Sequence, residues 1–298
     1  MSRNLGPMFA LLIIGAGWGI TSPLSKIAVS TGHQPLGLVF WQMVIGAVLL
    51  GAIVFVRGGR LALGRRQITL YLAIAFLGTI LPNAASYRAA AHLPAGVMSI
   101  VIAMVPMFAF PIALALGQDR FSIARVVGLG LGLGGVALLV GPEASLPDRA
   151  MVAFIPLALI APFFYGLEGN FVGKFGTAGL DPIEVLFGAS VFGAVLSFPL
   201  ALGFGHWLNP LGGFGAPESA LVLSSIVHAL VYAGYVWLVG RAGPVFAAQV
   251  SYLVTIFGVG WAMLILDEAY SGYIWGALGL MLLGMFLVQP RDREEVAA

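Results

Sequence analysis

The chain lacks cysteine and has little charge. None of its 298 residues is a cysteine, which excludes disulfide bonds, thiolate catalysis and thiolate metal sites. Charged residues make up only 9% of the chain, against about 25% in soluble domains. The formal net charge is +2, and no basic run is interleaved with aromatic residues as a nucleic-acid groove requires. We therefore expect no nucleic-acid partner.

Catalytic and metal-binding motifs are missing as well. The sequence contains neither G-x-S-x-G nor H-E-x-x-H. The few histidines are far apart, and only His228 falls inside an expected membrane span. A lone histidine there is more often hydrogen-bonded structure than a metal ligand. We predict no catalytic residue, no metal site, no cofactor and no enzymatic activity.

Apolar residues take the place of charge. They form 60% of the chain, and 41 glycines come in addition. A soluble protein of this size could not bury so much apolar surface, so we expect lipid as the solvent. A spanning helix needs about 20 apolar residues, which leaves room for ten spans and no separate soluble domain. The expected spans are 7–29, 36–56, 68–90, 94–116, 122–141, 151–175, 182–203, 219–240, 244–266 and 271–290.

The two halves of the chain repeat one pattern. The matching positions are Trp18-Gly19 with Tyr165-Gly166, 147 residues later, and Asp119–Ser122 with Glu268–Ser271, 149 residues later. We divide the chain into a first five-helix repeat, residues 1–145, and a second, residues 150–298. Because five is odd, the second copy must enter the membrane inverted, as in many transporters. The predicted fold is an all-α membrane protein with ten transmembrane helices in two inverted five-helix repeats.

The distribution of Lys and Arg predicts the orientation. Eleven lie on the side of the N-terminus, and three, namely Lys26, Arg88 and Arg149, lie on the other side. The positive-inside rule then places both termini in the cytoplasm. The apolar run 8–14 resembles a signal peptide, but cleavage would remove the partner of residues 165–177. We expect this segment to be retained as the first span.

A glycine-rich run occupies the fifth span. Residues 128–135 satisfy G-x-G-x-x-G, but no strand precedes them, so a dinucleotide site is a poor interpretation. Small residues let membrane helices approach closely. The tenth span repeats the pattern, and we assign both spans to scaffold and helix packing, with a subunit contact as an alternative.

Glu168 is the one acidic residue well inside an expected span. A charge at the membrane centre costs about 2.5–3.5 kcal/mol, so its side chain should face a cavity or a partner. Glu168 is then either a protonated or hydrogen-bonded structural residue, or a group that meets a substrate ammonium or carries a proton. Lys26 and Arg88, near the outer span ends, either snorkel to the headgroups or hold a carboxylate at a cavity mouth.

Polar and aromatic residues select the spans that should line a central cavity. Spans one, three, four, six, eight and nine carry them, whereas spans two and seven are nearly devoid of polar groups. Aromatic residues there either form a wall for a planar or apolar substrate or fill space. The candidate substrate-binding residues are Trp18, Thr21, Asn83, Tyr87, Ser99, Tyr165, Glu168, His228, Tyr232 and Tyr252. The candidate hinges are Pro82, Pro106 and Pro162, each of which frees a backbone carbonyl.

Several short pieces resemble the drug/metabolite transporter superfamily of the EamA type. These pieces are Trp18-Gly19, Leu93–Gly96, Pro106, Asp119–Ser122, Gly243-Pro244, Glu268 and Gly276–Gly284. Asp119 stands where the family usually has Glu, and Thr255 replaces a proline expected in span nine. The second departure implies that span nine bends less than span four.

Within the superfamily, the chain most resembles bacterial aromatic amino acid exporters. The resemblance implies a multi-pass protein of the bacterial inner membrane that exports aromatic and other apolar amino acids by alternating access. An alternative is an exporter of other metabolites or cationic drugs, proton-coupled through Glu168. The expected partners are a small-molecule substrate and the bilayer, with the protein a monomer or weak homodimer. An inert scaffold is disfavoured by the paired repeats and the polar stripe.

Overall fold

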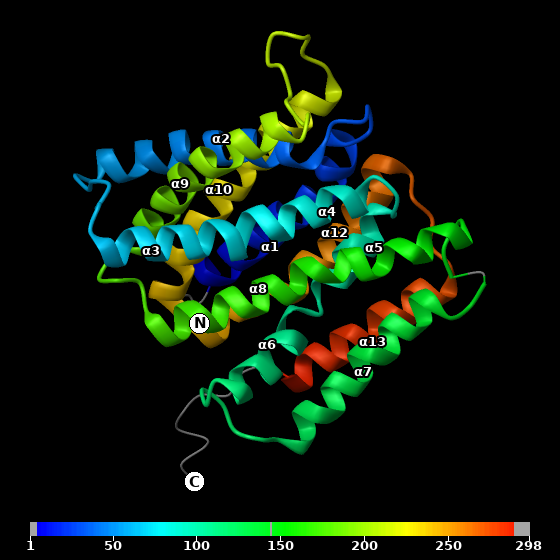
Figure 1. Cartoon of the computed structure of the whole chain (residues 1–298). Coiled ribbons are helices and arrows are strands. Elements are labelled where there is room, and N and C mark those ends of the chain that lie inside the picture. The colour runs from blue at the N-terminus through cyan, green and yellow to red at the C-terminus, as the bar shows by residue number, and fades with distance from the viewer. Residues whose placement is uncertain (1–4, 144, 289–298) are drawn as a thin grey trace.

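The computed structural model describes residues 5–143 and 145–288, and this part is helical and without strands (Figure 1). The first copy contains α1 (Leu5–Ala28), α2 (Pro35–Val56), α3 (Arg65–Ile74), η2 (Ala75–Ile80), α4 (Leu81–Ala90), α5 (Ala95–Ile102), α6 (Val105–Ala115) and α7 (Ile123–Val140). The second copy contains η3 (Arg149–Phe154), α8 (Ile155–Phe175), α9 (Pro182–Gly203), α10 (Ala216–Ala242), α11 (Pro244–Ala248), α12 (Val250–Leu266) and α13 (Gly272–Val288).

These elements form the ten predicted spans. In the described part of the chain, nine helical stretches are long and apolar enough to cross a bilayer. The tenth, α13, has 17 described residues and is about 26 Å long, near the lower limit for a spanning helix. The last two residues of the predicted tenth span, 289–290, lie outside the described residues, as do Arg3, Arg291 and Arg293 of the charge count.

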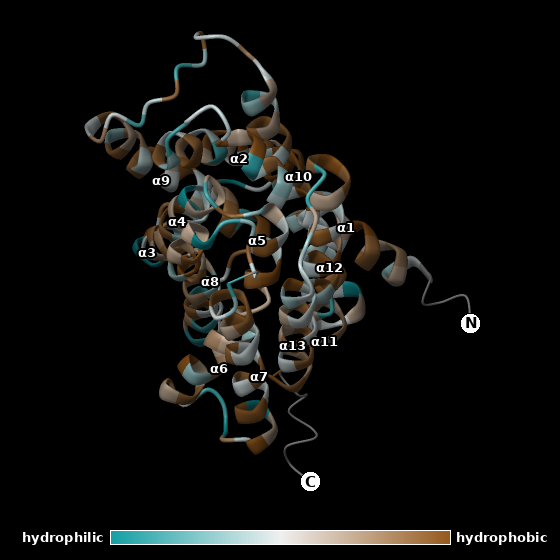
Figure 2. Ribbon diagram, turned by 90° about the vertical axis from the view of Figure 1, so that its right-hand side faces the viewer, coloured by the Kyte–Doolittle hydropathy of each residue, from teal (hydrophilic) through white to brown (hydrophobic). Residues whose placement is uncertain are grey.

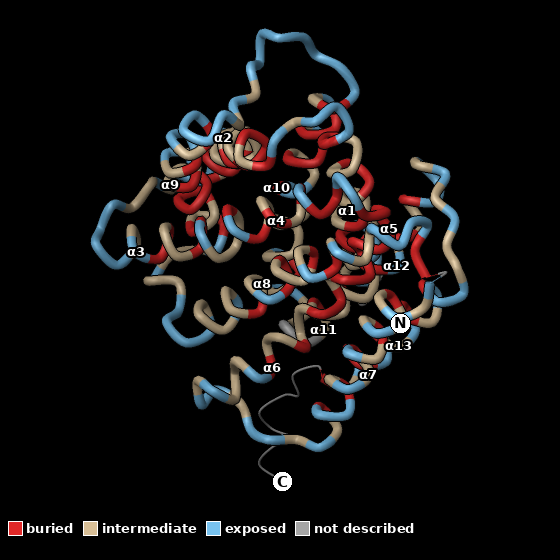
Figure 3. The backbone as a smooth tube through the Cα atoms, turned by 45° about the vertical axis from the view of Figure 1, so that its right-hand side comes forward, coloured by how far each residue is buried: buried red, intermediate tan, exposed pale blue. Residues whose placement is uncertain are grey.

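The outer surface of the bundle is apolar. Val48 of α2, Val195 of α9 and Phe286 of α13 are each about two-thirds exposed, at 66%, 66% and 70%. Figure 2 shows hydrophobic residues over the helices and hydrophilic ones gathered at the connections. Figure 3 shows the buried residues where helices meet inside the bundle. A soluble monomer rarely exposes so much apolar surface, so this surface faces lipid.

The helix contacts follow the inverted repeat. Equivalent spans of the two copies pack on each other in the pairs α7 with α13, α2 with α9 and α5 with α12. Helix α1 packs on α10 of span eight and α12 of span nine. Its counterpart α8 packs on α4 of span three and α6 of span four, which are the equivalent spans of the first copy. Such exchange of partners is what a pseudo-two-fold axis between two inverted copies produces. The predicted fold is confirmed.

Glycines hold α7 and α13 together at the side of the molecule. A Cβ atom on Gly128 would lie 2.7 Å from the Gly284 carbonyl oxygen, and one on Gly284 would lie 2.6 Å from that of Gly128. Neither position has room for a side chain, because the obstacle is backbone. The glycine-rich run therefore serves helix packing, in line with its interpretation from the sequence.

Spans three and four are interrupted near two of the candidate hinges. The π-helical segment η2 ends just before Pro82, where the helical ladder must change. Span four breaks at residues 103–104, between α5 and α6. Pro106 has no N–H to donate to the Ile102 carbonyl, which accounts for a break at this point.

Spans six and nine behave differently. Helix α8 runs unbroken through Pro162. Span nine breaks at Gln249, close to its start, and α12 then runs unbroken through Thr255. The expectation that span nine bends less than span four stays a prediction, because both spans are interrupted, span four at residues 103–104 and span nine at Gln249.

Candidate functional site

Four polar side chains form a hydrogen-bonded network between α2, α4 and α8. Asn83 donates from Nδ2 to Oε1 of Gln42 over 3.0 Å, and the Tyr87 hydroxyl donates to the same oxygen over 3.1 Å. The Tyr165 hydroxyl donates to Oδ1 of Asn83 over 2.7 Å. Polar groups inside an apolar bundle require such partners. Because Tyr165 belongs to the second copy, the network joins the two repeats.

Glu168 lies on α8, about one turn beyond Tyr165. Its carboxylate occupies a notch at Gly78 of η2, where a Cβ atom would lie less than 3.0 Å from the carboxyl atoms. Tyr165 and Tyr232 lie within electrostatic range of this carboxylate. In the ranges that the structure describes, the carboxylate has no ion-pair partner. A carboxylate inside a membrane bundle without a cation nearby is expected to serve a function.

An aromatic cluster lies between α1 and α10. Trp18 donates from Nε1 to Nδ1 of His228 over 3.2 Å. The Trp18 ring meets Tyr232 edge-on at 6.0 Å between centroids and Tyr235 at 5.4 Å. Tyr232 is also within electrostatic range of Glu168, so the aromatic cluster and the carboxylate lie in the same region of the bundle.

Three of these side chains are deep in the bundle but accessible. His228, Glu168 and Tyr232 are surrounded by protein, yet His228 is exposed and the other two are only half-buried. Side chains of a closely packed core lose their accessible surface. These three side chains therefore keep surface that a small molecule can reach.

The remaining predicted site residues bond to the backbone of their own helix or pack in the apolar core. The Thr21 hydroxyl donates to the Trp18 carbonyl within α1 over 2.6 Å. Ser99 is buried and donates to the Ala95 carbonyl over 3.1 Å. Tyr252 packs on the apolar core around α5 and α13, and its buried hydroxyl has no partner among the described residues. The predicted residues that the structure brings together are Trp18, Asn83, Tyr87, Tyr165, Glu168, His228 and Tyr232.

Two residues of the site escaped the sequence analysis. The sequence predicts that span two is nearly devoid of polar groups, yet Oε1 of its Gln42 accepts hydrogen bonds from both Asn83 and Tyr87. A single amide in the apolar run 35–56 was the available signal. Gly78 gave no signal, because nothing in the sequence marks the helix face on which Glu168 rests.

The side chain of Lys26 contacts backbone carbonyls, a role that the sequence does not predict. Its Nζ donates to the carbonyl oxygens of Leu93 over 2.9 Å and Ala91 over 3.4 Å. It therefore caps the carboxyl end of α4, where a cation is favourable. Arg88 is exposed.

Glu268 joins the two copies at the same end of the bundle. Its carboxylate accepts the N–H groups of Ala95 over 2.8 Å and Gly96 over 3.1 Å, at the start of α5. It also accepts the Tyr270 hydroxyl over 2.6 Å. Burial and the neighbouring carboxylate raise the pKa of Tyr270 above its usual range. We call Glu268, Tyr270, Ala95 and Gly96 the Glu268 staple.

The equivalent position in the first copy has different partners among the residues that the structure describes. Asp119, the counterpart of Glu268, pairs with Arg125 and accepts the N–H of Arg120, both within its own copy. Arg125 lies over the ring of Phe110, 5.2 Å from its centroid. Within the described residues, Glu268 therefore bonds to the other copy, whereas Asp119 bonds to Arg120 and Arg125 in its own copy.

A crevice of about 560 Å³ lies elsewhere, between α2, α9 and α10. None of the ten predicted site residues lines it. In the described part of the chain, no group of three or more His, Asp or Glu residues is placed to hold a metal ion.

Comparison with known proteins identifies the family. A model of the EamA-like transporter family matches residues 5–141 and again residues 153–289. The chain belongs to the EamA-like transporter family. As a member of this family it is a multi-pass membrane transporter of a small-molecule substrate, and not an enzyme.

Individual relatives agree with this assignment. The uncharacterized transporter YvbV of Bacillus subtilis (strain 168) is 27% identical over 98% of this chain and 93% of its own. The uncharacterized inner membrane transporter YedA of Escherichia coli (strain K12) is 24% identical over 95% and 89%. A solved crystal structure has the same fold, with a TM-score of 0.64, 20% identity and coverage of 94% of this chain and 96% of the other.

Proposed function

We propose that this EamA-like transporter exports amino acids, aromatic and other apolar ones above all, by alternating access. The observation that carries the proposal is the Glu168 carboxylate next to Tyr165, Tyr232 and the amide network of Gln42 and Asn83. Glu168 would bind the α-ammonium group, and amide and hydroxyl donors would bind the carboxylate. The faces of Trp18 and Tyr232 suit an aromatic or aliphatic side chain.

The alternating-access part is supported by differences between the two ends. The Glu268 staple bridges the copies at one end, whereas Asp119 pairs inside its own copy at the other. In a transporter built from inverted repeats, one state should favour such bridges at one end and the opposite state at the other. The breaks before Pro82 and Pro106 provide points at which spans three and four can bend.

The location and orientation are also part of the proposal. A relative named as an inner membrane transporter supports the bacterial inner membrane. The excess of Lys and Arg on the side of the N-terminus, eleven against three, supports cytoplasmic termini. Because one chain contains both repeats, a monomer or weak homodimer is sufficient.

A second candidate function is the export of organic cations. It is favoured by the absence of a cation next to Glu168 in the described structure and by the engagement of Lys26 with Ala91 and Leu93. A site with one carboxylate and several aromatic faces suits a cation without a carboxylate group.

Flux into proteoliposomes distinguishes the two candidates. We expect labelled Phe and Trp to be transported, and Glu168→Gln to slow that transport by roughly thirty-fold, because a charge-assisted hydrogen bond is lost. Glu143→Gln, which changes an exposed carboxylate, should leave flux unchanged. Transport of an organic cation without transport of Phe or Trp would replace the first candidate with the second. Running each assay with and without a pH gradient tests proton coupling.

A further inference from the structure

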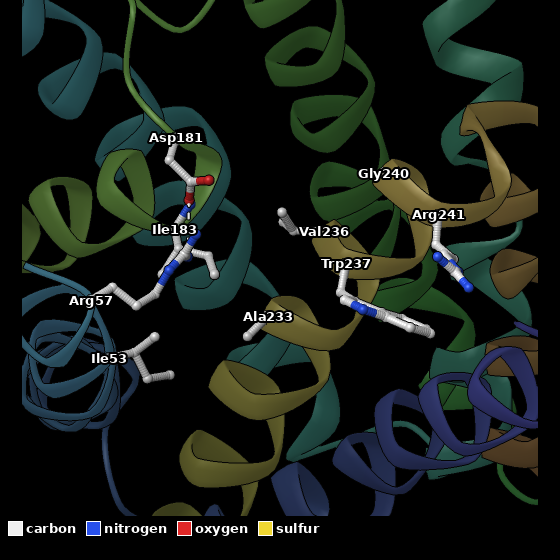
Figure 4. Close-up of a pocket in the computed structure, with 9 residues that line it drawn as sticks. All are labelled: Ile53, Arg57, Asp181, Ile183, Ala233, Val236, Trp237, Gly240 and Arg241. Atoms are coloured by element: carbon white, nitrogen blue, oxygen red, sulfur yellow. Dashed lines mark hydrogen bonds and ion pairs between the residues drawn. The ribbon is translucent and has the colours of Figure 1, made fainter. Parts of the chain in front are cut away.

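The crevice between α2, α9 and α10 has a built charge pattern. Ile53, Ile183, Ala233 and Val236 make its walls apolar. Arg57 and Arg241 stand on opposite sides of it, as Figure 4 shows. Both arginines are exposed. Arg57 directly follows α2, which ends at Val56, and Arg241 is the second-last residue of α10, which ends at Ala242.

The crevice faces away from the candidate substrate site. Its lining residues on α10 are Ala233, Val236, Trp237 and Gly240, which recur at the spacing of one helix face. The residues of α10 that meet Trp18 are His228, Tyr232 and Tyr235, on another face. The crevice therefore opens between α10 and α2 and is separate from the Glu168 site.

Its position matches the depth of phospholipid headgroups. The charged residues lie at the ends of three spans, and Ile53, Ile183 and Val236 lie within about two turns of those ends. Trp237 is 54% exposed, and tryptophan is enriched at the level of the headgroups. Basic pockets between membrane helices are known to bind anionic headgroups.

Asp181, the acidic residue that lines the crevice, already has hydrogen-bond and ion-pair partners. Asp181 accepts the N–H of Ile183 over 2.9 Å as the N-cap of α9, and it pairs with Arg57 over 3.6 Å. Asp181 therefore competes with any bound anion for Arg57. Among the residues that line the crevice, two guanidinium groups stand against this one carboxylate, so the lining has a net positive charge.

We propose that this crevice binds an anionic phospholipid. Its phosphate lies between Arg57 and Arg241, and one acyl chain lies against Ala233 and Val236. Arginine suits this role because its planar group forms paired hydrogen bonds with phosphate oxygens. The lipid is a structural ligand of the bundle and takes no part in binding the transported molecule.

Native mass spectrometry of the full chain in detergent tests the proposal. With phosphatidylglycerol and phosphatidylcholine of identical acyl chains, we expect the wild type to retain phosphatidylglycerol about tenfold better. The double variant Arg57→Ala/Arg241→Ala should lose this preference. Arg65→Ala/Arg120→Ala removes two exposed arginines outside the crevice and should keep it.

A variant that is expected to bind more lipid separates a specific effect on binding from a loss of folding. Asp181→Asn keeps a good N-cap residue but removes the competing carboxylate, so retention of phosphatidylglycerol should increase several-fold. Equal retention by both double variants, or no change with Asp181→Asn, would overturn the proposal. Displacement of the lipid by millimolar inorganic phosphate would instead identify a site for a free anion and would also refute it.

Discussion

At the scale of the residue, the candidate site depends on what surrounds one carboxylate. Glu168 is placed by the absence of a side chain at Gly78 and by its neighbours Tyr165 and Tyr232. The obstacle that a Cβ atom at Gly78 would meet is the flexible end of the Glu168 side chain and not backbone. The carboxylate, more easily than the helix, would therefore give way.

Gly78→Ala is thus expected to reduce transport without unfolding the protein. Displacement of the carboxylate should slow amino acid flux by about tenfold, while a helix-favouring residue changes stability by at most about 1 kcal/mol. Flux and thermal unfolding of the same preparation measure both effects. Gly169→Ala on α8, where a Cβ atom meets nothing within 4 Å, is the matched control. Wild-type flux in Gly78→Ala would show that the position of the carboxylate is unimportant.

At the scale of the element, the start of α5 is held by the other copy of the repeat. The Glu268 staple satisfies two N–H groups that no helix can satisfy by itself. Lys26 caps the preceding helix α4 at the same end. The connection between α4 and α5 is therefore fixed from both sides. Under the proposed alternating access, release of this connection is the local change expected when this end opens.

Glu268→Gln should loosen α5 and expose residues beneath it. A neutral amide keeps one acceptor and loses the charge, which costs about 1.4 kcal/mol, equivalent to tenfold in an opening equilibrium. The chain contains no cysteine, so Val97→Cys, at a position with 0% exposure, reports opening through its rate of reaction with maleimide. We expect that rate to rise about tenfold when Glu268→Gln is added.

A second carboxylate provides the control for this experiment. Glu184 accepts the N–H of Asp181 at the start of α9 over 3.1 Å, at the other end of the bundle. Glu184→Gln should leave the labelling of Val97→Cys unchanged. Equal acceleration by both variants would mean that the staple has no special part in opening, and that any lost helix cap loosens the bundle.

At the scale of the whole molecule, the repeat made the fold predictable from sequence. Apolar run lengths and the offset between Asp119 and Glu268 are enough to predict ten spans and their inversion, because both depend only on pattern. The site was less predictable. Gln42 became the centre of a network through partners 41 and 45 residues away, and no pattern within span two indicates such partners. The different pairing of Asp119 and Glu268 also depends on tertiary contacts.

Because the two copies are nearly equivalent, the orientation of the protein in the membrane depends on the loops that connect the spans. Because inverted repeats pack alike in either direction, the apolar spans alone do not distinguish up from down. The excess of Lys and Arg, eleven against three, then decides which end stays in the cytoplasm. Chemical labelling of residues in the loops can therefore measure the orientation.

Two single-cysteine variants test the orientation in intact cells. Leu211→Cys replaces a residue that is 91% exposed between α9 and α10, and Phe121→Cys one that is 72% exposed between α6 and α7. With the arginine-rich end in the cytoplasm, a membrane-impermeant maleimide should label Leu211→Cys at once and Phe121→Cys only after permeabilisation. The reverse pattern would mean that the charge count gives the wrong orientation. Partial labelling of both would mean that each orientation is populated, as expected if the charge difference were too weak to select one.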